Sequence, residues 1–333
     1  MTDLTYDVLG IGNAIADVFA HVESDFLVKE NLVKGSMRLV DTEEAERLYG
    51  KMGSAVSMSG GSAGNTIAGL ASLGGKAAFI GKVADDELGD AYGHDMRDIG
   101  AHFATPPLIG SNPTARCMVL ITPDGERTMN TYLGACTELG PDDIDPQVVG
   151  ASAITYMEGY LWDPPTAKEA FRCAMDMAHA AGRQTALTLS DSFCVDRYRG
   201  EFQDLVRNGD VDILFANEHE LKALYETSDI HTAVNAVRED AKLATVTLSE
   251  KGSLTVTRHK TYQVRANPVD EVVDLTGAGD LYAAGFLLGL ARDYPLQRCA
   301  ELGCMSAAEV IGHVGARPNG SLKTLATQSG FDV

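Results

Sequence analysis

The sequence has 333 residues, of which 45% are hydrophobic, and its formal net charge is −20. This length accommodates a large buried core, in one α/β domain or in two smaller domains. The negative charge argues against a nucleic acid or an anionic membrane surface as a partner and is typical of a soluble protein.

The cysteines and the N-terminus indicate a reducing compartment. No C-x-x-C pair and no histidine cluster at zinc spacing occurs, so the six cysteines are expected to be buried free thiols. The N-terminus lacks a basic segment followed by an apolar stretch. The longest apolar run, 281–291, is interrupted by glycines and is shorter than the ~20 residues of a membrane span. We therefore expect a cytoplasmic protein with no membrane partner.

Short strand-like runs alternate with helical patterns along the chain. The predicted strands are 8–11, 77–83, 153–160, 184–189, 211–215 and 243–248. The predicted helices are 62–73, 166–181 and 218–225. Strands separated by helices of this length imply βαβ units, and therefore an α/β fold with a mostly parallel sheet flanked by helices on both faces.

Two segments, 21–40 and 114–133, break this alternation, because their strand-like runs have no helix between them. In the second segment an Asp-Gly pair at 124–125 predicts a hairpin turn. We expect a small β flap built from discontinuous pieces, about 18–42 and 112–134. Such a flap would exclude water from a cleft. An edge extension of the main sheet is the alternative.

A loop of small residues, DLTGAGD at 274–280, opens a predicted helix. Free backbone N–H groups of Gly277, Ala278 and Gly279 would converge where the helix dipole favours negative charge. Asp280 would repel an anion there, so a role in anion binding alone does not explain it. Its position makes sense if it accepts the proton of a hydroxyl while the N–H groups hold the phosphoryl group that this hydroxyl attacks. A plain helix N-terminus with an acidic first turn is the alternative, and the segment alone does not decide between them.

Three further segments place polar groups at strand ends or helix starts. Paired glycines at 59–65 allow close backbone approach to a ligand, and Asn65 can both donate and accept hydrogen bonds. Asp17, soon after the first strand, could accept hydrogen bonds from two neighbouring hydroxyls. Asn217 and Glu220 lie three residues apart on one helix face, where they could organise Mg²⁺, its waters and phosphate. Each such residue taken alone is more often a cap.

Three familiar motifs are rejected. The segment 10–15 lacks the third glycine of a dinucleotide fingerprint. The Gly-Lys pair at 75–76 lacks the first glycine and the final Ser or Thr of a P-loop. A Gly-x-Ser-x-Gly pattern at 60–64, followed by Asp280 and His313, has the residue order of a serine hydrolase. It comes too early in the chain, since a nucleophile elbow normally follows several strands.

Together these segments resemble the PfkB (ribokinase-like) carbohydrate kinase family over nearly the whole chain. GGSAGNTIAGLASLGGKAAFIGKVADDELG at 60–89 is similar to the N-terminal signature, and DLTGAGDLYAAGF at 274–286 is similar to the C-terminal one. NEHE at 217–220 is similar to the N-x-x-E motif between them. The resemblance implies a Rossmann-like α/β domain with a β lid, a small-molecule substrate, ATP as phosphate donor and Mg²⁺ as cofactor.

The resemblance also implies roles for individual residues. It makes Asp280 the catalytic base and places the anion hole at Gly277, Ala278 and Gly279. Asn217 and Glu220 would lie with Mg²⁺ and phosphate. Many members need a monovalent cation such as K⁺ near the anion hole, and Asp274 lies where that site would be. The implied nucleotide-binding residues are Thr247, Ser249, Gly252 and Ser306, with Ser249 standing where the family motif T-x-G-x-x-G has glycine.

Within the family, the chain is most similar to the adenosine kinase branch. The opening G-x-G-N-x-x-x-D and the segments GERTMNTYLGAC, LTLSDSFCVDRYR and VDILFANEHE carry this similarity. The second of these places Arg127 of the lid on the transferred phosphate. The implied substrate-binding residues are Asn13, Asp17, Gly61, Ser62 and Asn65.

The sequence therefore predicts a kinase that phosphorylates a primary hydroxyl of a ribose-containing small molecule, with adenosine as the first choice. A sugar kinase for ribose or a ketohexose is the alternative within the same chemistry. A non-catalytic, ligand-sensing protein on the same fold is the alternative from another class. We expect a monomer or homodimer, and an Asp280 that is ionised at neutral pH because a helix N-terminus stabilises its anion.

Overall fold

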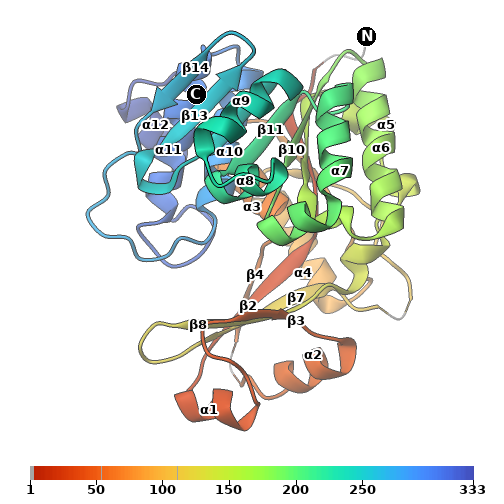
Figure 1. The fold of residues 1–333 in the computed structure, drawn as a ribbon. Helices are drawn as coiled ribbons and strands as arrows, with labels where there is room; N and C mark the ends of the chain where they lie inside the picture. The colour runs from red at the N-terminus through yellow and green to blue at the C-terminus, as the bar shows by residue number, and fades with distance from the viewer. Residues whose placement is uncertain (1–3, 54, 111) are drawn as a thin grey trace.

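The computed structural model describes residues 4–53, 55–110 and 112–333, which form a large α/β body and a smaller flap (Figure 1). The body is built on a nine-stranded sheet with the order β14-β13-β12-β11-β10-β9-β1-β5-β6. Its strands pair in parallel except for β13 and β14, which are antiparallel at one edge. The strands are β1 Tyr6–Ile11, β5 Ala77–Ile80, β6 His102–Phe103, β9 Ser152–Glu158, β10 Gln184–Thr188, β11 Ile213–Asn217, β12 Leu243–Thr247, β13 Ser253–Thr257 and β14 Thr261–Val264.

Helices cover both faces of this sheet, which confirms the predicted fold class. One layer comprises α3 Ser62–Ser72, α4 Glu87–Asp98, α10 Ala278–Ala291, α11 Leu296–Val310 and α12 Leu322–Gln328. The other comprises α5 Pro146–Gly150, α6 Pro165–Ala180, α7 Ser192–Asn208, α8 Glu218–Leu224 and α9 Ile230–Asp240. Successive side chains of β1 serve the two cores, since Val8 packs with the first layer and Leu9 with the second. Both are fully buried, as expected of a central parallel strand.

Most predicted elements are present with small shifts in their ends. The strand expected at 211–215 runs instead from Ile213 to Asn217, because the N–H of Val211 donates to the carbonyl of Leu205 (3.1 Å) and not to a strand. The predicted free thiols are confirmed, and among the six cysteines only Cys173 is half-buried while the others are buried.

The flap is a second, five-stranded sheet with the order β3-β8-β7-β2-β4 and two helices. Its elements are β2 Ile15–His21, α1 Ser24–Lys29, β3 Met37–Leu39, α2 Thr42–Tyr49, β4 Val56–Ser59, β7 Ala115–Ile121 and β8 Arg127–Tyr132. The hairpin expected from the Asp-Gly pair joins β7 to β8, and Gly125 has the positive φ of 82° that its turn requires. The first flap segment, expected at 18–42, extends in the structure from β2 to β4.

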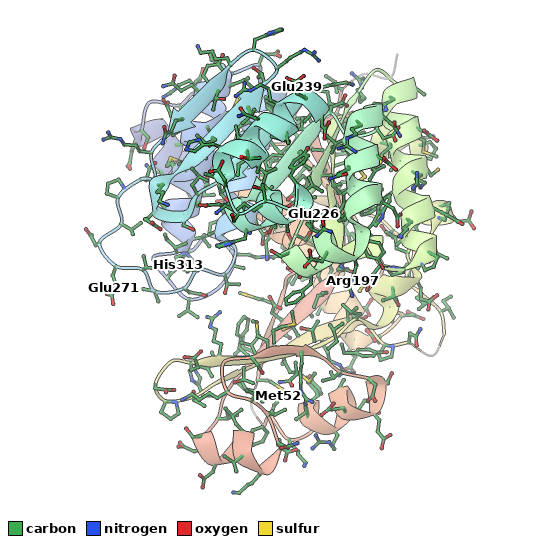
Figure 2. All side chains as sticks on the ribbon, viewed as in Figure 1. Met52, Arg197, Glu226, Glu239, Glu271 and His313 are labelled. Carbon is green, nitrogen blue, oxygen red and sulfur yellow. The ribbon has the colours of Figure 1, made fainter. Side chains whose placement is uncertain are left out.

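The absence of helix between residues 21 and 40 was a wrong prediction, because α1 lies there. This short helix buries Leu27 against the flap sheet, with Asp25 in its first turn and Lys29 in its last, as the helix dipole favours. Figure 2 shows Met52 between this sheet and the two flap helices, in the core that they share. Within the described ranges, every helix falls short of the length and apolar character that a membrane span requires.

Candidate active site

The candidate site lies where the carboxyl ends of the parallel strands face the flap. The loop after β1 runs directly into β2, so one short stretch of chain joins the body to the flap. The strand ends at Glu158, Thr188 and Asn217 lie along the same edge, because their strands pair in register. In a parallel sheet this edge is the usual place for ligand binding.

Asp280 occupies the first turn of α10 and meets two polar side chains of α3. Its Oδ1 accepts a hydrogen bond from the Ser62 hydroxyl (2.7 Å), and its Oδ2 accepts one from Asn65 Nδ2 (3.2 Å). The two helices approach closely at Gly69, where a Cβ would lie 2.4 Å from a methyl group of Leu281. The missing side chain at Gly69 therefore brings residues more than 200 positions apart into one site.

Burial raises the pKa of Asp280 to about 6, while the hydrogen bonds from Ser62 and Asn65 act in the opposite direction. The predicted ionisation at neutral pH holds with this pKa. Desolvation opposes this ionisation, whereas the hydrogen bonds from Ser62 and Asn65 favour it; the contribution of the helix dipole stays a prediction. A carboxylate with a pKa near 6 is a better proton acceptor than an exposed aspartate and still carries its charge at pH 7.

The backbone before Asp280 is arranged for an anion, with one departure from the prediction. Gly277 caps α10 with a positive φ of 81°, a backbone conformation that glycine adopts without strain. The N–H of Ala278 is not free, since it donates to the carbonyl of Leu275 (3.2 Å). Among the described residues we find no acceptor for the N–H groups of Gly277, Gly279 and Asp280. These three groups are therefore available to a phosphoryl oxygen.

Asp17 projects from β2 toward the same site, and it lies close enough to Asp280 for the two charges to interact. Burial raises the pKa of Asp17 to about 7; the positive charges of Arg317 and Arg127 lower it, and Asp280 raises it. We find no hydrogen bond to the Asp17 carboxylate among the described residues. Gly60 lies against it, since a Cβ there would be 2.3 Å from Asp17 Oδ2. The carboxylate is therefore free to accept hydrogen bonds from a ligand.

Glu158, which sequence reasoning missed, organises the loop that carries the predicted ligand Asn13. Its carboxylate accepts hydrogen bonds from Asn13 N (2.8 Å), Asn13 Nδ2 (2.6 Å) and Ala63 N (2.8 Å). It is 1% exposed, and burial raises its pKa to about 7. It thus fixes the loop after β1 to the start of α3, where Gly61 and Ser62 lie. The available signal was a carboxylate at the end of an otherwise apolar strand.

Arg127, at the start of β8, reaches from the flap to the loop before the anion hole. Its Nη1 forms an ion pair with Asp274 Oδ2 (2.8 Å), and its buried Nη2 has no hydrogen-bond partner among the residues that the structure describes. The Asp274 carboxylate also accepts hydrogen bonds from Thr276 N and Oγ1 and from Gly315 N. The side chain of Asp274 is therefore already saturated by protein donors, and its predicted contact with a monovalent cation stays a prediction.

Asn217 and Glu220 form the capping box of α8. Asn217 N and Nδ2 donate to the two Glu220 oxygens (2.9 and 2.6 Å), and Glu220 N donates to Asn217 Oδ1 (2.9 Å). This is the cap that we named as the usual role of such residues. Burial raises the pKa of Glu220 to about 7. The pair does lie at the predicted edge, but both side chains are engaged with each other.

The surroundings of Tyr160 fit a divalent cation that is held mainly by phosphate and water. Burial raises the pKa of the Tyr160 hydroxyl, and the charges of Asp191, Asp280 and Glu220 add to this. These three carboxylates therefore lie near enough to Tyr160 for their charges to act on its hydroxyl. In the part of the chain that the structure describes, no cluster of three His, Cys, Asp or Glu side chains is close enough to hold a metal alone. Mg²⁺ usually takes one or two carboxylates and completes its shell with phosphate and water.

A cavity of about 450 Å³ lies beside the anion hole, between the loop before Asp274 and the helices α11 and α12. Its lining includes Val269, Glu271, Met305 and Glu309. Figure 2 shows Glu271 and His313 on loops at the flap-facing side of the body, and backbone hydrogen bonds join these loops at Ile311. A mixed apolar and acidic cavity of this size suits an aromatic base.

The predicted nucleotide-binding residues are only partly placed for this role. Thr247 ends β12, and Ser249 and Gly252 form the turn into β13 with positive φ angles of 53° and 94°. A Cβ at Gly252 would lie 2.0 Å from the carbonyl oxygen of Val264, so glycine is required there. Ser306 is fully buried and donates to the carbonyl of Leu302 (2.9 Å), which leaves its side chain unavailable to a nucleotide.

Comparison with known proteins agrees with this geometry. Residues 29–323 match the description "pfkB family carbohydrate kinase". Adenosine kinase from Sinorhizobium meliloti is 56% identical, with a TM-score of 0.90 over 98% of this chain and 100% of that one. A probable sugar kinase protein from Rhizobium etli CFN 42 is 52% identical, with a TM-score of 0.91 over 98% and 99%. ATP-dependent ribose-1-phosphate kinase from Halopiger xanaduensis is 30% identical over 78% of this chain and 82% of that protein.

Proposed function

The chain belongs to the pfkB family of carbohydrate kinases, and from this premise we propose that it transfers the γ-phosphoryl group of ATP to the 5′-hydroxyl of adenosine. The observation that carries the kinase chemistry is the position of Asp280. Its carboxylate accepts hydrogen bonds from two side chains of α3. The backbone N–H groups at and just before this residue have no acceptor among the described residues. A proton acceptor and an anion site therefore adjoin.

In the proposed reaction Asp280 takes the proton of the substrate hydroxyl as that oxygen bonds to the γ-phosphorus. The bond from this phosphorus to the bridging oxygen breaks, and ADP leaves with the bonding electrons. The N–H groups of Gly277, Gly279 and Asp280 hold the phosphoryl oxygens, and Arg127 supplies a positive charge from the flap. The carboxylates near Tyr160, Asp191 and Glu220 among them, would hold Mg²⁺ together with the phosphates, and the ion would supply positive charge against the ATP phosphates. The cavity lined by Val269 and Met305 would take the base of ATP.

The flap favours a nucleoside over a free sugar as the acceptor. Strand pairing sets Met58 opposite Asp17 and Val56 opposite Phe19, so these four side chains share one face of the flap. The helices α1 and α2 cover the opposite face, where Val18 is buried. Val56 is 69% exposed and Met58 is 37% exposed. An apolar surface beside Asp17 suits a flat base stacked next to the ribose that Asp17 binds, whereas a free sugar has no apolar group to place there.

A substrate panel tests the proposal. Steady-state phosphorylation of adenosine, inosine, ribose, ribose 1-phosphate and fructose would be compared at equal ATP and Mg²⁺. We expect adenosine to have the highest kcat/KM. A free sugar or ribose 1-phosphate as the preferred acceptor would overturn the nucleoside assignment and favour the sugar kinase alternative. No turnover with any acceptor would favour a ligand-sensing protein.

A matched pair of variants tests the role of the apolar face. Val56→Thr should raise the KM for adenosine about tenfold, because it removes apolar contact from the base, which corresponds to 1.4 kcal/mol. Val28→Thr makes the same exchange at an equally exposed residue of α1, outside this face, and should leave KM unchanged. Equal effects of the two variants would contradict the placement of the base.

A further inference from the structure

Arg317 is a half-buried arginine near the proposed acceptor site, and among the described residues no oxygen or nitrogen atom accepts a hydrogen bond from its guanidinium. It follows Ala316, whose backbone lies against Gly277, since a Cβ at Gly277 would be 2.6 Å from the Ala316 carbonyl oxygen. Its Nη2 contacts the sulfur of Met96 in α4 (3.5 Å), and its buried Nε has no hydrogen-bond partner within residues 4–53, 55–110 and 112–333. A thioether is a weak acceptor, so the guanidinium is left with unmet hydrogen-bonding capacity.

The groups around Arg317 connect it to Asp17 through Gly60. Tyr92, one helical turn before Met96, donates its hydroxyl to the Gly60 carbonyl (3.1 Å). Gly60 is the residue that lies against the Asp17 carboxylate. The charge of Arg317 is the largest that lowers the pKa of Asp17, followed by that of Arg127. The contacts that run from Arg317 through Met96, Tyr92 and Gly60 to Asp17 therefore agree with this charge interaction. In the part of the chain that the structure describes, no hydrogen bond joins Arg317 to Asp17.

Asp95 is the other carboxylate near Arg317, and it does not satisfy the guanidinium. Its Oδ2 accepts hydrogen bonds from Ser59 N (3.2 Å) and Ser59 Oγ (3.3 Å). Burial lowers the pKa of Arg317, and the charges of Tyr92, Asp95 and Asp17 oppose that effect. A buried N–H without an acceptor costs about 1–3 kcal/mol, so an acceptor that arrives with a ligand would remove this cost.

We propose that Arg317 is a substrate-positioning residue of the acceptor site. One sugar hydroxyl would donate a hydrogen bond to the Asp17 carboxylate, and the oxygen of the same hydroxyl would accept a hydrogen bond from the Arg317 Nε–H. A hydroxyl both donates and accepts hydrogen bonds, so a carboxylate and an N–H beside it can both bind the same hydroxyl. The pair distinguishes a sugar with this hydroxyl from a deoxy analogue, because the analogue leaves two buried polar groups unpaired. This inference rests on the proposed function, since it requires an acceptor with hydroxyls at Asp17.

The test is a thermodynamic cycle that combines one substitution in the protein with the removal of one hydroxyl from the substrate. Binding of adenosine, 2′-deoxyadenosine and 3′-deoxyadenosine would be measured by calorimetry without ATP, for the wild type and for Arg317→Gln. For the wild type, we expect removal of the hydroxyl that Asp17 binds to weaken binding at least tenfold. In Arg317→Gln this penalty should fall to about threefold or less, and kcat for adenosine should stay within threefold of the wild type.

Two further variants separate positioning from charge and from folding. Arg317→Lys keeps the charge near Asp17 but lacks the Nε geometry, so it should lose discrimination between adenosine and its deoxy analogue as the glutamine variant does. Arg292→Gln removes the same charge from an arginine that donates to the Gly74 carbonyl, and it should behave as the wild type. Thermal unfolding of each variant shows whether it folds. If Arg317→Gln does not fold, Arg317→Lys alone tests the inference.

An unchanged deoxy penalty in folded Arg317→Gln and Arg317→Lys would overturn the inference and leave Arg317 a structural residue. Failure of the adenosine assignment is visible separately. If the substrate panel selects ribose, the same cycle with ribose and 2-deoxyribose tests Arg317 on that acceptor.

Discussion

The two carboxylates of the site predict different pH dependences for kcat and kcat/KM. Burial raises the pKa of Asp280 to about 6 and that of Asp17 to about 7. Both must be ionised in the free enzyme, Asp17 to accept hydrogen bonds from the acceptor and Asp280 to accept its proton. Because both pKa values are raised, protonation on the acidic side removes activity, and activity is regained as the pH rises through 6 to 7.

The magnitude follows from these two pKa values. At pH 5 about one-tenth of Asp280 and about one-hundredth of Asp17 would be ionised. The parameter kcat/KM reports the free enzyme, so its logarithm should approach a slope of two below pH 6, with a loss of about 10³-fold by pH 5. The parameter kcat reports the complex, in which the bound acceptor keeps Asp17 ionised. It should fall with a slope of one, by about tenfold over the same range.

A coupled assay of ADP release at saturating ATP, from about pH 5 to about pH 9, measures both profiles. Asp17→Asn should reduce the acid limb of kcat/KM to a slope of one while leaving that of kcat unchanged. Asp280→Asn should retain acceptor binding and lose about two or more orders of magnitude in kcat at every pH. A kcat that stays constant down to pH 5, or near-normal turnover by Asp280→Asn, would refute the assignment of Asp280 as the base.

Three further predictions concern the supports of the site. Gly277→Ala should lower the free energy of unfolding, measured in urea, by about 1–3 kcal/mol, because residue 277 has a positive φ and its Cβ would meet Ala316. Gly279→Ala should leave the free energy of unfolding unchanged, because a Cβ there meets nothing within 4 Å. Arg127→Gln should lower kcat at least about tenfold, and Arg127→Lys should recover part of it, since the charge beside the anion hole returns. Equal kcat values for both variants would contradict this. Glu158→Gln should raise the acceptor KM about tenfold with a smaller effect on kcat, because the substrate loop loses a charged hydrogen-bond acceptor. A KM unchanged by that variant would contradict its positioning role.

The local backbone features of the candidate site could be predicted because they depend on residues that are neighbours in sequence. The small residues before Asp280 indicated a helix start with exposed N–H groups, and the positive φ of Gly277 agrees with that prediction. The alternation of strands with helices indicated a parallel sheet, since parallel strands need long crossover connections, which are usually helical. The helix α1 was not predicted, because its six residues are too few to show a 3.6-residue period.

The same local rules could not decide the roles of residues whose partners are set by packing. Asn217 and Glu220 have the spacing of a phosphate and metal site, but the same spacing is that of a capping box, which the structure shows. Ser306 was expected at a nucleotide, yet it lies on the buried side of α11. Which face of a helix is covered depends on the elements that pack on it, and the motif itself does not contain this information.

The sequence by itself determined the fold class and the chemical type of the central loop, because these follow from periodicity, glycine positions and local hydrogen-bonding capacity, and its motifs carried the resemblance to the family. Only the tertiary structure decided which groups meet. The contact of Asp280 with Ser62, the support of the substrate loop by Glu158 and the charge interaction of Arg317 with Asp17 join segments far apart in the chain. Burial then sets the pKa values of these carboxylates, since desolvation depends on everything that surrounds a group and not on its neighbours in sequence.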